Sequence, residues 1–395
     1  MWLKMYDFII VHYNEIAIKG NNRYLFEDKL VSNITNQLVI PKGGIIKRFG
    51  LILIDLSLVP EKDEQKIKEI LLRIPGIAYF CFSRKAKNDY IDIKEKTIEL
   101  LKETDFKTFK VIARRSNKKF FMNSREVNEK LGEYVLETLN KKVDVHAPDT
   151  IIYVEIGDRE TIIYTNKIVG VGGLPVGSTS KVICSLSGGL DSPVAGYIMM
   201  KRGCDVVFVH IYNNSLVKEE IKNKIKLLVN QLTKFQGKSK LYIVPFSDIQ
   251  KEIIANIPST HRMIIYRRYM FKIMNQIARI ERAKGIVTGD SLGQVASQTL
   301  DNIACIYKAS NIPVLPPLIG MNKDEIIEIS KKIGTYEASI IPYPDCCSFM
   351  NSDHPVTKGW YDDILKFEQD ISPKEENLIK EAIEKAEIYE SAFPK

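Results

Sequence analysis

The residues best suited to chemistry form a short run at positions 187–192, with the sequence Ser-Gly-Gly-Leu-Asp-Ser. Paired glycines let a ligand approach the backbone closely, and the first turn of a helix presents N–H groups that lack partners within the helix. These features favour an anion site for phosphate groups. The hydroxyls of Ser187 and Ser192 add hydrogen-bond donors, and the carboxylate of Asp191 could hold Mg²⁺ or orient the loop.

Two structural explanations of this run stay open at this point. A Gly-Gly pair often marks only a tight turn, and Asp191 could be a helix cap. Two better-known phosphate motifs are absent, because no Gly-x4-Gly-Lys-Ser/Thr sequence occurs and residues 170–175 do not fit the dinucleotide fingerprint. The apolar strand pattern before the run and the helical pattern after it favour a nucleotide site over a plain turn.

The elements around this run alternate between strands and helices. We predict strands at residues 182–186, 205–211, 241–244 and 285–288. A helix is predicted at 193–201, where Pro193 lies in the first turn and its missing N–H costs little. The alternation predicts an α/β fold with a parallel sheet and helices on both faces. Ligands of such sheets bind beyond the carboxyl ends of the strands, where the run would lie.

The first part of the chain has a different, α+β pattern. We predict strands at 7–11, 51–56, 77–82, 109–113, 151–156 and 161–164, and helices at 22–37, 64–72 and 123–138. A glycine-rich joint follows at 170–177. We therefore expect domains at residues 1–60, 61–168 and 169–395.

A basic run lies in the second of these domains. Between positions 106 and 125 there is no acidic residue, and the basic residues are Lys107, Lys110, Arg114, Arg115, Lys118, Lys119 and Arg125. Basic side chains neutralise phosphates, so we interpret the run as an RNA contact. The candidates for tRNA binding are Lys110, Arg114, Arg115, Lys118, Lys119 and Arg125. For the interleaved Phe106, Phe109, Phe120 and Phe121 we favour core positions over stacking on bases.

The composition is that of an ordinary globular protein, with 45% apolar and 27% charged residues. Apolar runs are far shorter than the ~20 residues of a membrane-spanning helix, and the N-terminus has no signal-peptide pattern. We therefore expect a cytoplasmic protein without a membrane partner. The net charge of +8 mildly favours a polyanionic partner, and six cysteines in 395 residues are too sparse for a disulfide scaffold.

The run at 187–192 resembles the loop of PP-loop ATP pyrophosphatases, which transfer AMP from ATP to a substrate oxygen. Other stretches narrow the resemblance: residues 14–23, 109–132, 288–299 (Thr-Gly-Asp-Ser-Leu-Gly-Gln-Val-Ala-Ser-Gln-Thr), 319–327 and 342–347 (Pro-Tyr-Pro-Asp-Cys-Cys). Over nearly its whole length the chain resembles the tRNA 4-thiouridine synthetase family, ThiI, in a form without a C-terminal rhodanese domain.

The resemblance implies an N-terminal ferredoxin-like domain, a THUMP RNA-binding domain and a PP-loop catalytic domain. It also implies that ATP and Mg²⁺ are used to convert uridine 8 of tRNA to 4-thiouridine, with Asp191 and Cys346 as catalytic residues. The family's ATP contacts fall on Ser185, Leu186, His210, Ile211, Arg267, Gly289 and Gln298, which join Ser187, Gly188, Gly189, Asp191 and Ser192 of the loop. His210 could also be a buried strand-end residue, and Arg267 part of a solvated helix face.

The sulfur step would depend on a cysteine in a proline-bounded loop, where a thiolate is accessible. The resemblance aligns Cys346 with the family's catalytic cysteine, while Cys347 could act in its place or as its partner. We expect Cys81, Cys184, Cys204 and Cys305 to be buried structural residues. An external donor, either a persulfide carrier protein or sulfide, would supply the sulfur. No Cys-x-x-Cys spacing supports an iron–sulfur cluster.

Two other functions stay open on sequence grounds. A PP-loop amidating ligase would use ammonia, but it would need neither an RNA-binding module nor a Cys-Cys loop. An RNA-binding protein without catalysis would not need the intact loop at 187–192. A homodimer and a role in thiamine biosynthesis are also left open, the latter requiring a sulfur carrier. The tail at 375–389 has helical spacing.

Overall fold

The computed structural model describes residues 5–48, 50–102, 104–213, 219–342 and 355–394. The chain forms two units, Met1–Leu174 and Pro175–Lys395, and the division falls within the glycine-rich joint. The domain boundaries at residues 60 and 168 stay predictions. Cys346 and Cys347 belong to residues 343–354 and lie outside the described part of the chain.

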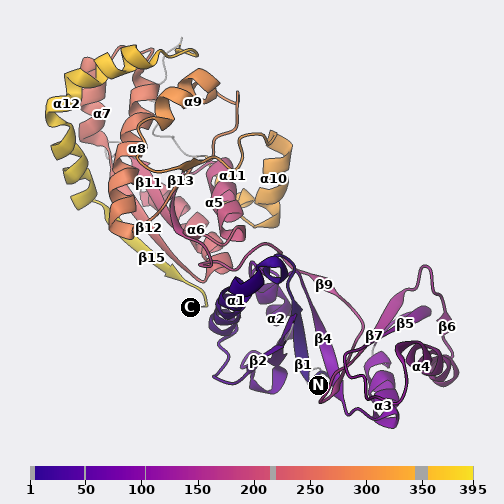
Figure 1. Ribbon diagram of the computed structural model, residues 1–395. Helices are drawn as coiled ribbons and strands as arrows, with labels where there is room; N and C mark the ends of the chain where they lie inside the picture. The colour runs from indigo at the N-terminus through magenta and orange to yellow at the C-terminus, as the bar shows by residue number, and fades with distance from the viewer. Residues whose placement is uncertain (1–4, 49, 103, 214–218, 343–354, 395) are drawn as a thin grey trace. The chain divides into compact units, whose positions relative to one another are not determined.

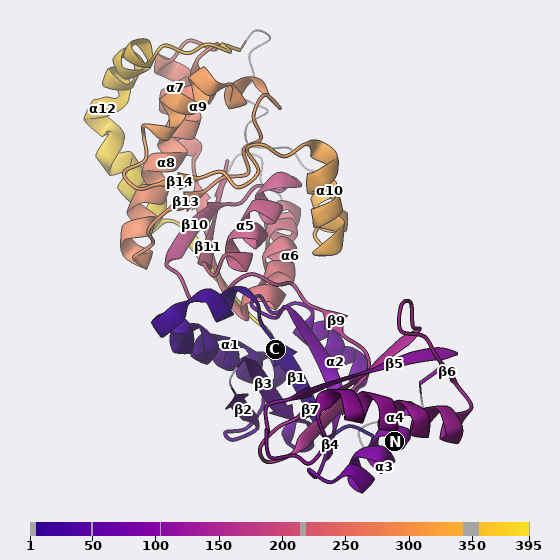
Figure 2. The same ribbon diagram turned by 45° about the vertical axis from the view of Figure 1, so that its right-hand side comes forward.

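One sheet of nine strands forms the centre of the first unit (Figures 1 and 2). Its order is β2-β3-β1-β4-β8-β7-β5-β6, and β9 also pairs with β4. The strands are β1 (Phe8–His12), β2 (Ile45–Arg48), β3 (Leu51–Asp55), β4 (Tyr79–Ala86), β5 (Thr108–Arg115), β6 (Lys142–Val143), β7 (Thr150–Ile156), β8 (Thr161–Tyr164) and β9 (Ile168–Val169). The helices are α1 (Arg23–Leu38), α2 (Glu64–Leu71), α3 (Tyr90–Leu101) and α4 (Ser124–Leu139).

Two hydrophobic cores lie between this sheet and its helices. Ile9 and Val11 of β1 pack with residues of α1 and α2, while Phe8 and Ile10, which point to the other face of the sheet, are buried in a separate cluster. Val111 of β5 packs in the same way with residues of α3 and α4, and Figure 2 shows α4 beside β5. Strand β4 connects the two cores, because it pairs antiparallel with β1 on one edge and with β8 on the other.

The second unit is a six-stranded sheet with the order β14-β13-β10-β11-β12-β15. Its strands are β10 (Lys181–Ser185), β11 (Asp205–Tyr212), β12 (Lys238–Pro245), β13 (Ile286–Val287), β14 (Val314–Leu315) and β15 (Glu387–Ala392). Its helices are α5 (Asp191–Lys201), α6 (Glu219–Gln236), α7 (Ser247–Asn256), α8 (Arg262–Glu281), α9 (Leu300–Tyr307), α10 (Lys323–Lys332), α11 (Tyr336–Ile340) and α12 (Tyr361–Glu384).

The first five of these strands are parallel, and helices cover both faces of the sheet, as predicted. Val207 and Val209 point to the face that packs against α7, α8 and α12. On the other face, Phe208 and Cys184 lie against Gly196 of α5. Figure 1 shows α8 and α12 on one side of the sheet and α5 and α6 on the other. The carboxyl ends of the parallel strands therefore meet at one edge, where the loops after β10 and β13 lie side by side.

Two predictions about this fold were wrong. The tail at 375–389 is not one helix, because α12 ends at Glu384 and β15 pairs antiparallel with β12 at the edge of the sheet. Exposure alternates residue by residue along β15, which is the period of a strand. Phe106, Phe109 and Phe120 are core residues as expected, but the side chain of Phe121 is 72% exposed. Among the described residues, no helix has the length and apolarity that a membrane span needs.

An ion cluster ties the end of α8 to two strands of the sheet. The Glu281 carboxylate accepts hydrogen bonds from Lys181 (2.9 Å), Lys240 (2.9 Å) and the hydroxyl of Tyr242 (2.7 Å). Burial alone would raise the pKa of Glu281, but these donors outweigh it and lower the pKa from 4.5 to about 2. Because the pKa is lowered, the carboxylate stabilises the fold above its unfolded pKa, and this stabilisation is lost as pH falls toward 2.

We therefore expect Glu281→Gln to lower the free energy of unfolding at pH 7 by about 3 kcal/mol. The difference between wild type and variant should shrink between pH 4.5 and about 2. Urea unfolding of the full chain at several pH values measures both quantities, with the exposed Glu376→Gln as control. An equal loss at pH 7 and at pH 3 would contradict this role for the carboxylate.

Candidate active site

Hydrogen bonds between its two serines close the loop that follows β10. The hydroxyl of Ser192 accepts from the backbone N–H of Ser187 (2.8 Å) and lies 3.0 Å from the hydroxyl of Ser187. The Ser187 hydroxyl also accepts from the N–H of Gly189 (3.3 Å). The serines at both ends of the run therefore fix the shape of the loop, a role additional to the predicted donation to phosphate.

The loop leads directly into α5, which begins at Asp191. Leu190 occupies the N-cap position, and its apolar side chain cannot accept from the amides of the first turn. Gly289, after β13, lies against this turn: a Cβ atom there would be 2.8 Å from the backbone nitrogen of Ser192. Glycine is therefore required at 289 for the loop after β13 to approach the start of α5, where the helix dipole favours an anion.

Asp191 connects the loop at residues 187–192, called the phosphate loop below after its predicted ligand, to two other segments. Its carboxylate accepts from the Lys323 ammonium (2.8 Å) at the start of α10 and from the Gln294 amide (3.3 Å) in the loop after β13. A cation and an amide thus lie beside the predicted anion site. Sequence reasoning did not select Lys323 or Gln294. A signal was available for Gln294, which follows a predicted strand of the parallel sheet, but not for Lys323, because the strand before it, β14, was not predicted.

A second cluster surrounds Asp290, whose side chain is 5% exposed. The Arg267 Nη2 lies 2.8 and 2.7 Å from its two carboxylate oxygens. The Gln298 amide (3.1 Å) and the Tyr307 hydroxyl (2.8 Å) also donate to it. Burial would raise the pKa of Asp290, but the charge of Arg267 and these donors outweigh it and hold the pKa below its ordinary value. The carboxylate is therefore ionised and paired.

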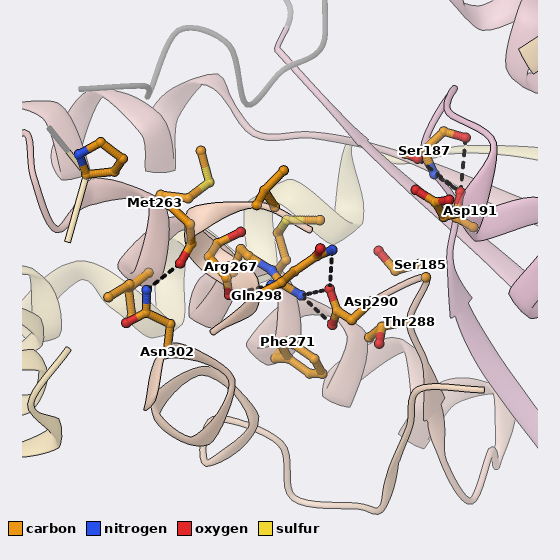
Figure 3. A pocket seen from close by; sticks show the side chains of 18 of the residues that line it. Ser185, Ser187, Asp191, Met263, Arg267, Phe271, Thr288, Asp290, Gln298 and Asn302 are labelled. Atoms are coloured by element: carbon orange, nitrogen blue, oxygen red, sulfur yellow. Dashed lines mark hydrogen bonds and ion pairs between the residues drawn. The ribbon is translucent and has the colours of Figure 1, made fainter. Parts of the chain in front are cut away.

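A pocket of about 430 Å³ joins the two clusters, with the phosphate loop at one end (Figure 3). One face of α8 forms much of its wall. Met263, Arg267, Met270 and Met274 follow helical spacing along this face, so Arg267 is the charged residue in a wall of methionines. Val295 and residues of the loop that reaches α9 also line the pocket, and the carbonyl oxygen of Ser297 in this loop accepts from Arg267 (3.3 Å). The pocket therefore combines the predicted anion site at one end with an apolar chamber of the kind that accepts small organic groups.

The structure brings seven of the twelve predicted ATP contacts together as lining of this pocket: Ser185, Ser187, Asp191, Ser192, Arg267, Gly289 and Gln298. The other five do not line it. Leu186, Gly188 and Gly189 belong to the loop itself, and His210 and Ile211 are buried at the end of β11. His210 Nδ1 lies 2.8 Å from the carbonyl oxygen of Leu186, so this histidine supports the backbone at the start of the loop.

In the first unit, the six predicted tRNA contacts differ in their surroundings. Arg114, Lys118 and Lys119 are exposed beside or beyond the end of β5. Arg125 is exposed and paired with Glu129 (2.8 Å), and Lys110 donates to the carbonyl of Val145 (3.0 Å).

The sixth of these residues, Arg115, is held by the backbone. Its Nη1 donates to the carbonyl oxygens of Phe120 and Met122, both at 2.9 Å. The Arg115 guanidinium therefore shapes the loop after β5, whereas Arg114 presents its charge to solvent.

The four described cysteines are buried, as predicted. Burial raises the pKa of the Cys81 and Cys184 thiols to about 12, which makes them poor nucleophiles at neutral pH. Cys346 cannot be placed, since it lies outside the described residues. Within the described ranges, no group of three or more His, Cys, Asp or Glu residues could hold a metal ion.

Three family models match successive parts of the chain. They are the ThiI ferredoxin-like domain at residues 8–81, the THUMP domain at 87–166 and the thiamine biosynthesis protein (ThiI) at 177–372. The fold is thus that of a PP-loop domain joined to a module with a ferredoxin-like and a THUMP domain.

Relatives of known class match almost the whole chain. A probable tRNA sulfurtransferase of Moorella thermoacetica is 41% identical over 97% of each chain, and one of Brevibacillus brevis is 39% identical over 98% of this chain and 96% of its own. The crystal structure of a 4-thiouridine synthetase–RNA complex with bound ATP matches with a TM-score of 0.90 and 33% identity, covering 98% of this chain and 99% of that one. The chain belongs to the ThiI family.

Proposed function

We propose that the protein is an ATP-dependent tRNA sulfurtransferase that converts uridine 8 of tRNA to 4-thiouridine. One observation carries this proposal: the pocket unites the Ser187–Ser192 loop, the start of α5 and the Arg267–Asp290 cluster at the carboxyl edge of a parallel sheet. Such a site holds a nucleotide by its phosphates. The full-length likeness to tRNA sulfurtransferases supports the choice of acceptor.

In this proposal, the loop amides and the start of α5 bind the phosphates of ATP, and Lys323 supplies a cation beside them. The carboxylate of Asp191 suits Mg²⁺, which binds one or two carboxylates together with phosphate oxygens. Asp191 would therefore hold Mg²⁺ with the triphosphate, and the ion would neutralise charge that develops as pyrophosphate leaves. Arg267 and Gln298, which line the pocket away from the phosphate loop, would contact the rest of the nucleotide.

The proposed reaction has two steps. The O4 atom of uridine bonds to the α-phosphorus of ATP, the bond from that phosphorus to the bridging oxygen breaks, and pyrophosphate leaves. A sulfur nucleophile then bonds to C4, and AMP departs with the former O4 atom. With sulfide as donor, no oxidation is involved. With a persulfide donor, the outer sulfur of the persulfide bonds to C4. A second thiolate then attacks the inner sulfur, which breaks the S–S bond, leaves the outer sulfur on C4 and forms a disulfide. An external thiol reduces this disulfide.

Cys346 is the proposed residue for this sulfur step, either as carrier of the persulfide or as the thiolate that forms the disulfide. Cys347 is its candidate partner. The donor itself, a persulfide carrier protein or sulfide, and association into a homodimer stay predictions, as do the cytoplasmic location, the thiamine role and any iron–sulfur cluster.

The whole proposal is tested by incubating the full chain with unmodified tRNA, ATP, Mg²⁺ and sulfide, and then measuring pyrophosphate and the mass of the tRNA nucleosides. We expect 4-thiouridine, with pyrophosphate release that depends on tRNA. A tRNA carrying cytidine at position 8 is the matched control and should give neither product. Absence of both products with the unmodified tRNA would overturn the proposal.

For tRNA binding, the structure separates two neighbouring arginines. We expect Arg114→Ala to weaken tRNA binding severalfold and to reduce the slope of log K against log salt by about 0.7–0.9, the effect of one lost phosphate contact. Filter binding at several salt concentrations measures both quantities. ATP affinity should not change, because Arg114 lies in the other unit of the chain.

Arg115→Ala is the matched comparison for this prediction. Its guanidinium binds two carbonyl oxygens, so its loss should lower the thermal stability of the first unit. An unchanged tRNA dissociation constant in Arg114→Ala at fixed salt would remove Arg114 from the RNA contacts. An unchanged melting temperature in Arg115→Ala would contradict the structural role of Arg115.

A further inference from the structure

The carboxylate of Asp290 is the point where three parts of the pocket wall meet. Its hydrogen-bond donors come from α8 (Arg267), from the short helix before α9 (Gln298) and from the last residue of α9 (Tyr307). We propose that Asp290 is a positioning residue that holds Arg267 and Gln298 in the geometry needed for ATP. This inference rests on the proposed function, since both residues are proposed ATP contacts.

Several contacts together fix the position of the Asp290 carboxylate relative to Arg267 and Gln298. Asp290 lies three residues after the end of β13, and its side chain is 5% exposed. Figure 3 shows the side chains of Arg267 and Gln298 converging on Asp290 between the phosphate loop and Met263. A single buried carboxylate thus sets the position of both groups that this part of the pocket wall offers to a nucleotide.

The charge balance shows what Arg267 can contribute. Its guanidinium is already compensated by Asp290, at 2.7 Å, so the pair adds little net charge to the pocket. Lys323 is likewise paired with Asp191, at 2.8 Å, so the charge of the triphosphate must be met mainly by the loop amides, the start of α5 and the Mg²⁺ proposed there. The Arg267–Asp290 pair instead fixes the orientation of the planar guanidinium, whose Nη1 also donates to the carbonyl oxygen of Ser297 (3.3 Å).

Gln298 depends on Asp290 in a different way. The carboxylate can only accept, so it fixes the amide of Gln298 with Nε2 toward Asp290 and Oε1 away from it. Oε1 is buried, with no hydrogen-bond partner among the described residues. An amide at 290 would offer one acceptor and one donor to partners that all donate, so at least one of them would lose its acceptor.

The neighbouring arginine provides a matched control on the same helix. Arg268 is 3% exposed and donates to the two oxygens of Glu368 on α12, at 2.9 and 2.8 Å. Neither of these residues lines the pocket. Asp290→Asn and Glu368→Gln therefore make the same chemical change, from carboxylate to amide, beside adjacent arginines of α8. Only the first change lies at the proposed ATP contacts.

The experiment measures ATP affinity by calorimetry, and KM and kcat for tRNA-dependent pyrophosphate release, using the full chain. We expect Asp290→Asn to weaken ATP binding by about 10- to 100-fold, the range for lost hydrogen bonds to a charged group. Its KM for ATP should rise, and Asp290→Glu should recover part of the loss because it keeps the carboxylate. Glu368→Gln should lower the melting temperature but leave the ATP dissociation constant unchanged.

The outcomes separate this inference from the proposed function. If the wild type shows no tRNA-dependent pyrophosphate release, the proposed function fails, while the ATP affinities still decide the role of Asp290. Wild-type ATP affinity in folded Asp290→Asn, or an equal loss of affinity in Glu368→Gln, would overturn the inference. If Asp290→Asn does not fold, the variant Tyr307→Phe tests the inference, because it removes one hydrogen-bond donor to the Asp290 carboxylate. This variant should bind ATP severalfold more weakly. An unchanged dissociation constant for ATP would overturn the inference.

Discussion

Asp191→Asn should lower tRNA-dependent pyrophosphate release by about 10²–10³-fold, because it removes the negative charge at the start of α5 while keeping the size of the side chain. Lys323 would lose its ionic partner at 2.8 Å, and Mg²⁺ would lose its proposed carboxylate. Single-turnover assays at saturating ATP measure the loss in the chemical step. The remaining activity should depend more weakly on the concentration of Mg²⁺ than that of the wild type.

The control for this variant is Asp301→Asn, which changes an exposed aspartate in the first turn of α9. It alters the charge at a helix start in the same unit without touching the phosphate loop, and it should retain activity. Full activity of Asp191→Asn, with an unchanged requirement for Mg²⁺, would show that Asp191 serves only as a partner of Lys323 and Gln294. The helix-cap alternative that the sequence left open is contradicted by the structure, because Leu190 occupies the N-cap position.

Cys346→Ser should abolish the formation of 4-thiouridine while leaving pyrophosphate release intact. A serine hydroxyl cannot carry a persulfide or form a disulfide, whereas adenylation of the uridine needs only the pocket described above. Nucleoside mass analysis and a pyrophosphate assay on the same reaction measure the two steps separately. Activated tRNA would then be hydrolysed back to uridine, giving AMP without thiolation.

Cys347→Ser is the comparison for this variant. If Cys346 carries the persulfide alone, Cys347→Ser should keep thiolation; if the two residues form the disulfide, both variants should lose it. Normal 4-thiouridine formation by Cys346→Ser, with a persulfide donor, would remove that residue from the sulfur step. Cys184→Ser should not affect the sulfur chemistry, because the Cys184 thiol is fully buried and its pKa is raised.

The sequence was sufficient to predict the parallel sheet and the strand–loop–helix arrangement at residues 182–201, because both leave local patterns. An apolar strand, a Gly-Gly turn and a helix start lie within a dozen residues, and the structure places Ser187 and Ser192 in contact there. The alternation of strands and helices then fixed which end of the sheet would hold the site. Four buried cysteines were also predicted correctly from their apolar neighbours.

Contacts between distant segments were not predictable in this way. The side chains of Lys323 and Asp191 meet across 132 positions of sequence, and Asp290 gathers donors from three separate elements. Arg114 and Arg115 look equivalent in the sequence, yet strand alternation and the loop after β5 give them different roles. The strand β15 was missed because its edge position depends on pairing with β12, which no local pattern reveals.

The strand β4 has a mechanical consequence for the RNA-binding part of the chain. It belongs at once to the ladder with β1 and to the ladder with β8, so both halves of the first unit share one backbone scaffold. Neighbouring strands are held ~4.8 Å apart by their hydrogen bonds, and such a scaffold stretches very little. The two halves of the unit are therefore held at a fixed spacing, and we expect an RNA that contacts both halves to be recognised through its shape.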